Sequence, residues 1–283
     1  MNGIEVKAVS KSFQHVKALN SVTLTFKENK IYGLLGRNGA GKSTLLNIIT
    51  NRLFSDSGTV LVDGERASEN DTAQQKIFLM SEATLYPDTM RVSDAFNWTK
   101  EFYGFFDSGY AESLCKEFGL SPKKKIKELS TGYRSIFKIV TALSVNAPYI
   151  LLDEPVLGLD ANHRDLFYKL LLKNYADNPR TFVISTHLIE EVSSVIEDIV
   201  IIKEGEIIKN QSCEELLKAG YTVTGAASDI DRYTAGKNVI GVDVLGGLKS
   251  AYILGEPDKS VSSGSLEFSR LDLQRLFIQL TNS

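Results

Sequence analysis

The sequence has little of what secreted, membrane-spanning or metal-binding proteins usually carry. Its two cysteines, Cys115 and Cys213, lie far apart in no metal-ligand spacing, so we interpret both as packing residues of a protein from a reducing compartment. Residues 1–6 have neither a basic start nor an apolar core, so we expect no signal peptide. No apolar run approaches the roughly 18 residues of a membrane span.

An excess of charge of one sign is also lacking. The chain carries 32 lysines and arginines against 35 aspartates and glutamates. Proteins that bind nucleic acid usually carry a basic excess, so we expect no nucleic-acid partner. A chain of 283 residues can bury a sizeable core, and we expect one large domain and one small one.

What the sequence does contain is a phosphate-binding loop. Residues 36–44 match G-x-x-x-x-G-K-S, between an apolar run at 31–35 and an apolar pattern at helical spacing. In a strand–loop–helix unit, backbone N–H groups and the helix N-terminus bind phosphate, so an accidental glycine-rich turn is disfavoured. Lys42 is predicted to contact the β- and γ-phosphates of ATP, and Ser43 to ligate Mg²⁺. The predicted nucleotide-binding residues of the loop are Gly36, Arg37, Asn38, Gly39, Ala40, Gly41, Lys42, Ser43 and Thr44.

Two later strands are predicted to bring charged or titratable residues to the same edge of a parallel sheet. Residues 149–152 are apolar and run into Asp153, a predicted Mg²⁺ ligand, and Glu154, placed to polarise water. Residues 181–185 form a buried strand that ends before His187. A single histidine is more often structural, but its place in this sheet favours a functional role.

Three further candidates have structural alternatives of similar weight. Glu82 follows the apolar run 77–80 and is either a ligand of the metal or the attacking water, or a solvent-facing loop residue. Phe13 either stacks on the adenine or packs at the end of a strand. Ser130 and Gly132 begin a helix that is either an ordinary helix start or a second phosphate-binding terminus.

Two segments differ from the rest in composition. Residues 90–128 have an aromatic surplus that indicates helices. Core packing accounts for most of these residues, and the alternative for the others is an exposed apolar patch for a protein partner. Residues 221–283 are glycine-rich, and we expect strands near 239–245 and 251–254 and a helix at 271–280. This stretch has no chemical motif that would assign it a function.

Taken in order, these motifs resemble those of the ATP-binding subunits of ABC transporters. The resemblance rests on the loop at 36–44, the segment Leu-Ser-Thr-Gly-Tyr at 129–133, Asp153–Glu154 and His187. It implies an α/β fold: a RecA-like P-loop NTPase core with an antiparallel β subdomain and a helical subdomain at about 83–145. It also implies a head-to-tail dimer, in which each ATP lies between one subunit's loop and the other's signature segment.

The resemblance also implies roles for individual positions. Phe13 resembles the aromatic residue that stacks on adenine, and Asp153 the carboxylate on the metal side. Glu154 is similar to the catalytic base, His187 to the γ-phosphate switch, and Asp160 to the acid that communicates across the dimer. The signature residues that would act on the partner's ATP are Ser130, Thr131, Gly132 and Tyr133.

This chain departs from the family pattern at three positions. Thr131 replaces a glycine of the usual L-S-G-G-Q, and Tyr133 replaces its glutamine. The glutamine of the lid corresponds to Glu82 if strand ends are matched, or to Ser81 if the residues that follow are matched; we prefer Glu82. These changes leave ATP binding intact and bear on the hydrolysis rate and on partner coupling.

The resemblance predicts an ATPase that powers a separate membrane permease from the inner face of the cell membrane, with ATP and Mg²⁺ as cofactors. The variant signature segment at 129–133 and the C-terminal appendix at 221–283 are most like those of exporters of antibiotics, peptides or toxic amphiphiles. We expect an ABC ATPase domain at 1–220, an α+β appendix at 221–283, and a homodimer or a heterodimer with a second ABC ATPase.

Two other functions remain as alternatives. A soluble ABC ATPase of ribosomes or DNA repair would usually carry two ATPase halves, long coiled coils or zinc motifs, and this sequence has none of them. A subunit that senses ATP but hydrolyses it poorly is disfavoured because Glu154 and His187 are both present.

Overall fold

The central sheet has six strands, and five of them run parallel. The computed structural model describes residues 2–258 and 266–282 and orders this sheet β10-β9-β3-β8-β7-β6. Only β10, at one edge, is antiparallel to its neighbour. The strands are β3 (Ile31–Leu35), β6 (Ile77–Met80), β7 (Tyr149–Asp153), β8 (Thr181–Thr186), β9 (Asp198–Lys203) and β10 (Glu206–Ser212). Since β3, β7 and β8 are neighbours, the residues that follow them meet at one edge of the sheet.

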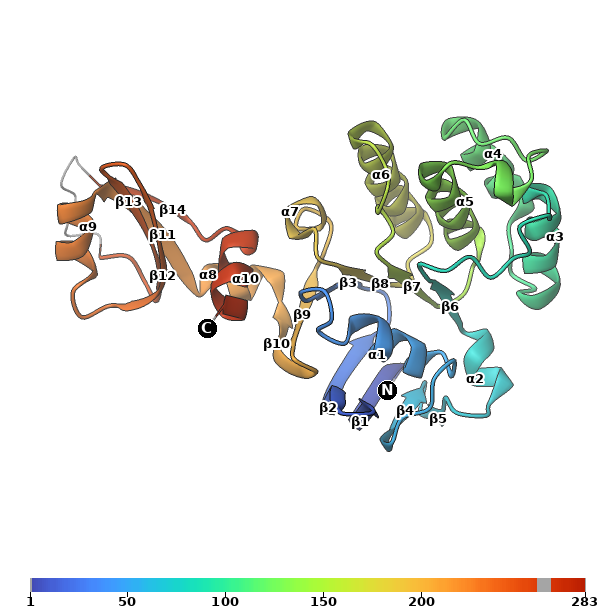
Figure 1. Ribbon diagram of the computed structural model, residues 1–283, viewed down its shortest axis with the longest axis horizontal. Helices are drawn as coiled ribbons and strands as arrows, with labels where there is room; N and C mark the ends of the chain where they lie inside the picture. The colour runs from blue at the N-terminus through green and yellow to red at the C-terminus, as the bar shows by residue number, and fades with distance from the viewer. Residues whose placement is uncertain (1, 259–265, 283) are drawn as a thin grey trace.

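A second, antiparallel sheet forms the expected antiparallel β subdomain and has the order β2-β1-β4-β5. Its strands are β1 (Gly3–Phe13), β2 (Val16–Lys27), β4 (Ser57–Val62) and β5 (Glu65–Arg66). Helix α1 (Lys42–Ile49) buries Leu45, Leu46 and Ile49 in the apolar core that this sheet shares with the central one. The short helix α2 (Asp71–Gln75) precedes β6. Helix α1 lies between the two sheets (Figure 1).

The helical segment expected at 83–145 consists of three helices and one short turn. They are α3 (Val92–Phe102), α4 (Ser108–Glu117), the 3₁₀ turn η1 (Ile126–Glu128) and α5 (Thr131–Ser144), beyond the β6 edge of the sheet (Figure 1). Phe96, Phe106 and Phe137 stack together in their core. The chain then forms α6 (Ala161–Asp177) beside α5 and the single-turn helix α7 (Ile189–Val192) after β8.

The last part of the chain builds a third sheet, of order β12-β13-β11-β14, away from the helical segment (Figure 1). Its elements are α8 (Cys213–Lys218), β11 (Gly220–Ala226), α9 (Ala227–Thr234), β12 (Asn238–Leu245), β13 (Leu248–Leu254), β14 (Glu267–Arg270) and α10 (Leu273–Asn282). Helix α9 packs Ile230 and Tyr233 against this sheet. Helix α10 instead buries Leu276 and Phe277 in the main core, next to α7. The strands expected near 239–245 and 251–254 and the last helix are present, whereas β11, α9 and β14 were not foreseen.

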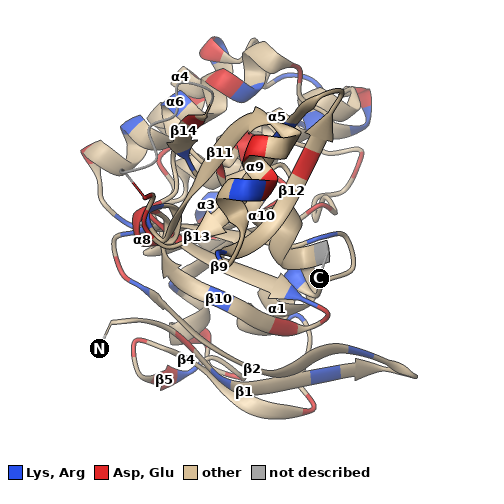
Figure 2. Cartoon of the chain, turned by 90° about the vertical axis from the view of Figure 1, so that its left-hand side faces the viewer, with Lys and Arg blue, Asp and Glu red and all other residues tan. Residues whose placement is uncertain are grey.

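Charges on the third sheet and its helices are mixed in sign. Figure 2 shows basic and acidic residues interspersed over the elements that face the viewer. Ion pairs join Lys249 to Asp231 and Arg275 to Asp243, so part of this charge is neutralised locally. Across residues 2–258 and 266–282, no helix is both long enough and apolar enough to cross a membrane.

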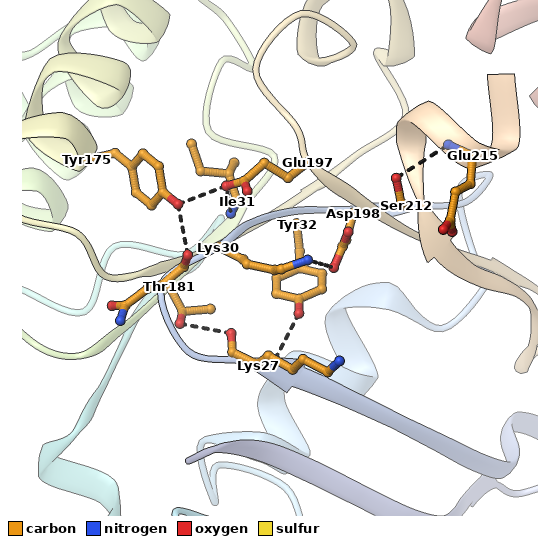
Figure 3. Close-up of polar contacts among 11 residues, drawn as sticks. Lys27, Lys30, Ile31, Tyr32, Tyr175, Thr181, Glu197, Asp198, Ser212 and Glu215 are labelled. Atoms are coloured by element: carbon orange, nitrogen blue, oxygen red, sulfur yellow. Dashed lines mark hydrogen bonds and ion pairs between the residues drawn. The ribbon is translucent and has the colours of Figure 1, made fainter. Parts of the chain in front are cut away.

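At the amino-terminal edge of the central sheet, polar side chains bond neighbouring strands and loops (Figure 3). Glu197 accepts hydrogen bonds from the Ile31 backbone N–H at 3.1 Å and from the Tyr175 hydroxyl at 2.9 Å. The Lys30 ammonium lies 2.7 Å from an Asp198 carboxylate oxygen. The Thr181 hydroxyl donates to the Lys27 carbonyl at 3.2 Å. These contacts fix the beginnings of β3, β8 and β9 relative to one another.

Candidate nucleotide site

The phosphate-binding loop has the backbone geometry that its glycines permit. Gly39 and Gly41 adopt φ angles of +82° and +109°, a region that favours glycine. A Cβ on Gly41 would lie 2.5 Å from the Ala18 carbonyl oxygen, so only glycine fits there. Helix α1 starts at the next residue, which directs its N-terminal N–H groups toward the loop. Of the remaining loop residues, Arg37, Asn38 and Ser43 are exposed, Thr44 is half-buried, and Gly36 and Ala40 are buried.

Lys42 joins the loop to the end of β7. Its side chain is buried, and its Nζ donates to the Gly36 carbonyl at 2.7 Å and lies 3.7 Å from Glu154 Oε1. Burial lowers the pKa of Lys42, while the nearby carboxylates of Glu154 and Asp153 oppose that shift. The structure thus brings together two motifs that are more than a hundred residues apart in the sequence.

The two carboxylates at the end of β7 are held by side chains from β8 and the residue after it. The Ser185 hydroxyl donates to Asp153 Oδ1 at 2.8 Å, because β7 and β8 pair with Asp153 opposite Ser185. For Glu154, Thr186 donates to Oε2 at 3.1 Å and His187 Nδ1 lies 2.8 Å from Oε1. Both oxygens of this carboxylate are therefore oriented.

Glu154 also has an unusual backbone conformation. Its φ angle is +48°, which for a residue other than glycine costs about 1–3 kcal/mol. Such strain persists only where the surrounding structure imposes it, and here the Glu154 N–H donates to the Ser185 carbonyl at 2.8 Å. The turn directs the Glu154 side chain toward Lys42 and His187 instead of along the strand.

Ser185 and Thr186 are positions whose roles the sequence did not reveal. Both lie in a buried strand, and both hydroxyls bond the carboxylates of β7. Two hydroxyl residues at the end of an otherwise apolar strand were the only available signal. A third such position is Lys138 on α5, whose Nζ donates to the Glu82 carbonyl at 2.7 Å and to the Ser81 carbonyl at 3.2 Å.

Glu82 and Ser81, the two candidates for the lid position, line different cavities. Glu82 and Glu154 line one cavity of about 370 Å³, together with Thr131, Arg134 and Lys138. Ser81 lines a different, apolar groove, and its hydroxyl donates to the Ala83 carbonyl at 3.0 Å. Only Glu82 therefore shares a cavity with the proposed catalytic carboxylate.

The signature segment begins α5 and packs against the loop that follows β7. Ser130 caps the helix, accepting the Tyr133 N–H at 3.4 Å. A Cβ on Gly132 would lie 3.0 Å from the Gly158 carbonyl oxygen, so a larger residue would displace that loop. The Ser135 hydroxyl donates to the Leu157 carbonyl at 2.8 Å, which adds a second tie between the two segments.

Asp160 caps the next helix, α6. Its carboxylate accepts the His163 N–H at 3.0 Å and lies 2.8 Å from His163 Nδ1, and these bonds hold the pKa of Asp160 below its usual value. The Tyr133 ring packs edge-on near the His163 ring, with centroids 6.3 Å apart. Tyr133, which replaces the usual signature glutamine, thus contacts α6, the helix that Asp160 caps.

Phe13 lies at the end of β1, in the hairpin with β2. Its ring is 45% exposed, with the Lys11 ammonium 5.7 Å from the ring centroid. The close approach of Ala18 to Gly41 places this hairpin against the phosphate-binding loop. An exposed aromatic ring there is available to stack on a base.

The oxygen donors at this edge suit a magnesium ion. Mg²⁺ prefers hard oxygen ligands such as hydroxyl and carboxylate groups. The nearly buried Asp153 carboxylate, with one oxygen fixed by Ser185, and the Ser43 hydroxyl on the loop provide them. These donors fit the ion that accompanies a nucleotide triphosphate in loops of this kind.

Comparison with known proteins agrees with this arrangement. A family model described as ABC transporter matches residues 19–157. The chain is similar to the ABC transporter ATP-binding protein YtrB of Bacillus subtilis, 31% identical over 228 residues that cover 81% of this chain and 78% of YtrB. It is 30% identical to NatA of the same organism over 212 residues, covering 72% of this chain and 85% of NatA. The ribose import ATP-binding protein RbsA of Bacillus cereus is 29% identical over 225 residues, 75% of this chain and 45% of RbsA.

Solved structures confirm the predicted fold. The ATP-binding subunit of an ABC transporter superposes with a TM-score of 0.69 at 22% identity, covering 77% of this chain and 92% of that one. A dimeric ATP-binding cassette bound to ADP and Pi superposes with a TM-score of 0.66 at 26% identity, covering 74% of this chain and 98% of its own. This chain therefore belongs to the family of ABC transporter ATP-binding proteins and is an ATPase of that family.

Proposed function

We propose that this ATPase powers a separate membrane permease that exports an antibiotic, a peptide or another toxic amphiphile. The observation that carries the permease part is an apolar groove beside the ATP site, described below. The export part is supported by the signature variant at 129–133 and by the appendix at 221–283. Similarity to RbsA, an import protein by its name, makes import the alternative direction.

The groove lies between β6 and the helices α3 and α5. It has a volume of about 350 Å³ and is lined mainly by apolar side chains from these elements and the loop after β6. Leu85, Trp98 and Phe102 line it and remain 65%, 50% and 71% exposed. Large exposed apolar side chains around a groove are typical of a protein interface, and a short helix of a permease would cover them.

We propose that hydrolysis uses the groups gathered at the carboxyl edge of the central sheet. The loop and the N-terminus of α1 bind the phosphates, and Lys42 neutralises charge on the β- and γ-phosphates. Glu154, oriented by Thr186 and His187, accepts a proton from the attacking water. Mg²⁺, when bound at Ser43 and Asp153, supplies further charge neutralisation.

We propose that two subunits enclose ATP, with Ser130 and Gly132 of one subunit completing the phosphate site of the other. The similarity to a dimeric cassette supports such a dimer, whether the second subunit is a copy of this chain or a second ABC ATPase. We also propose the division into an ATPase domain at 1–220 and an appendix at 221–283 that supports the contact between ATPases. The dimer would act at the inner face of the cell membrane.

A cysteine placed in the groove tests the permease proposal. The native Cys115 and Cys213 are buried, and burial raises the pKa of the Cys115 thiol to about 11, so an introduced exposed thiol would react first. We expect Phe102→Cys to form crosslinks to a polytopic membrane protein when the protein is treated with a bifunctional thiol reagent in its native membranes. Mass spectrometry of the crosslinked product identifies the partner.

The matched control places a cysteine at another largely exposed apolar position, on the third sheet. Leu245 is 83% exposed at the end of β12, a strand that lies at the opposite end of the molecule from α3 (Figure 1). Crosslinks to a membrane protein from Leu245→Cys and none from Phe102→Cys would contradict the docking groove. Ribosomal proteins captured by Phe102→Cys would overturn the permease proposal as a whole.

A further inference from the structure

Lys138 is a cation of α5 that no motif accounts for. It lies two turns after the signature serine and is half-buried. Its ammonium donates to the backbone carbonyls of Glu82 at 2.7 Å and of Ser81 at 3.2 Å. These two residues follow β6, so Lys138 attaches the segment after that strand to the helical part of the molecule.

The position of Lys138 is shared between two cavities. It lines the apolar groove next to Trp98 and Phe102, and it also lines the cavity that contains Glu82 and Glu154. Movement of α5 would therefore shift the Ser81–Glu82 segment relative to the proposed catalytic carboxylate. Because the tether is to backbone carbonyls, it does not depend on which side chain occupies position 82.

The charge of Lys138 also complements two acids of the second cavity. Glu82 and Glu154 both line that cavity, and Lys138 lines it with them. Two carboxylates in one cavity repel each other unless a cation lies between or beside them. Burial lowers the pKa of Lys138, but the carboxylates of Glu82 and Asp153 oppose that shift, which favours the charged ammonium.

We propose that Lys138 is a positioning residue for ATP hydrolysis, which holds the Ser81–Glu82 segment against α5 and balances the carboxylate of Glu82. This inference rests on the proposed role of Glu154 as the base, whose cavity Glu82 shares. Lys138 and Glu82 then form a functional pair: the lysine makes a second acid tolerable in that cavity. The electrostatic part of this role disappears if residue 82 is neutral, whereas the backbone tether does not.

A double-mutant cycle between Lys138 and Glu82 separates the electrostatic role of the lysine from its backbone tether. Lys138→Met keeps an unbranched side chain and removes the ammonium, and it is compared in the native protein and in Glu82→Gln. In the native protein we expect kcat to fall roughly tenfold, with a smaller change in KM for ATP. In the Glu82→Gln protein we expect the same substitution to lower kcat by less than about threefold.

Equal losses in both backgrounds would overturn the pairing, because a purely structural lysine would not respond to the charge at position 82. Lys138→Arg, which keeps the charge and donors, should retain kcat within about threefold, and a tenfold loss there would also contradict the role. If Lys138→Met does not fold, Lys138→Gln takes its place in the same cycle. Lys173→Met, at an exposed lysine of α6, is the control for loss of a lysine elsewhere.

The single variant Glu82→Gln tests the proposed place of Glu82 separately. Unchanged kcat and KM for ATP in that variant would remove Glu82 from the site. The effect of Lys138→Met is instead the difference between its losses of kcat in the native and in the Glu82→Gln background. Failure of the Lys138–Glu82 pairing can therefore be distinguished from failure of the proposed place of Glu82. Phosphate release and ATP titration on the purified protein supply all of these measurements.

Discussion

At the amino-terminal ends of β3, β8 and β9, side chains bond backbone groups or charges of neighbouring elements, as Figure 3 shows. At the carboxyl ends of β3, β7 and β8, the polar groups instead converge on one another: Lys42 lies next to Glu154, and Glu154 next to His187. The first set joins secondary-structure elements, so its loss should reduce stability. The second set brings charged and titratable groups together at one edge of the sheet, so its loss should reduce activity.

The backbone carries the same contrast. At the amino edge, the first residues of β3 and β8 have ordinary extended conformations, and side chains add bonds to a regular ladder. At the carboxyl edge, Gly41 and Glu154 both adopt positive φ, and the conformation of Glu154 is costly for its residue type. At the amino edge, the positive φ of +55° belongs to Asn29, a residue type that adopts this region more readily than glutamate does. The strain at Glu154 is consistent with a site built at the carboxyl edge at the expense of stability.

The largest effect should come from Glu154→Gln at the carboxyl edge. Glutamine keeps the shape and part of the hydrogen bonding but cannot accept the proton, so we expect kcat to fall at least about a hundredfold, within the usual range for a general base. ATP should still bind, and with Mg²⁺ it should favour a long-lived dimer. Phosphate release and size-exclusion chromatography with light scattering measure the two outcomes.

Glu197→Gln is the matched control at the amino edge. A glutamine oxygen can still accept from the Ile31 N–H and the Tyr175 hydroxyl, so we expect turnover to stay as in the native protein. Similar losses of kcat in Glu154→Gln and Glu197→Gln would contradict the assignment of activity to the carboxyl edge and stability to the amino edge. Substantial hydrolysis by Glu154→Gln would deny Glu154 the role of base.

An intermediate effect is expected when one hydroxyl is removed from each end of the same strand. Ser185→Ala frees the Asp153 carboxylate, and we expect kcat to fall roughly tenfold and the Mg²⁺ concentration for half-maximal activity to rise. Thr181→Val, at the start of β8, removes the bond to the Lys27 carbonyl and should leave both quantities unchanged. Metal titrations of ATPase activity make this comparison, and equal effects of the two substitutions would contradict it.

The charged residues of the carboxyl edge were more predictable from the sequence than the residues that hold them in place. The loop at 36–44 and Asp153–Glu154 follow local patterns, so their chemistry could be predicted from spacing. The role of Ser185 depends on strand register, since it lies opposite Asp153 across 32 residues of chain. Lys138 contacts Glu82 across 56 residues, and no local pattern encodes which face of α5 meets that segment.

The fold shows a similar division. Strands of the central sheet are short apolar runs bounded by turns and polar residues, so most were predicted at the right places. In the third sheet, α9 has only eight residues, too few for a pattern to distinguish a helix from a loop, and β14 is exposed throughout, so it has no alternating burial. Their structure depends on packing against β11 and β13, which sequence periodicity does not record.

The smallest effect should come from Tyr175→Phe at the amino edge. This substitution removes the hydroxyl, whose single proton is shared between the Asn29 carbonyl at 2.8 Å and Glu197 at 2.9 Å. We expect the free energy of unfolding at pH 7 to fall by about 1 kcal/mol, the net value of such hydrogen bonds, with kcat unchanged. Chemical denaturation and phosphate release measure the two quantities, and a loss of kcat as large as that of Ser185→Ala would contradict the comparison.

The same variant should also change how stability depends on alkaline pH. Burial and the bond to Glu197 raise the pKa of Tyr175 to about 12, whereas an unfolded tyrosine titrates near pH 10. Between these values the unfolded chain has lost this proton and the folded chain has kept it, so stability falls as pH rises through that window. Tyr175→Phe removes this contribution, and its free energy of unfolding should therefore decline less steeply from about pH 10 to 12 than that of the native protein. An unchanged slope would mean that the Tyr175 hydroxyl is not held at this edge as Figure 3 shows.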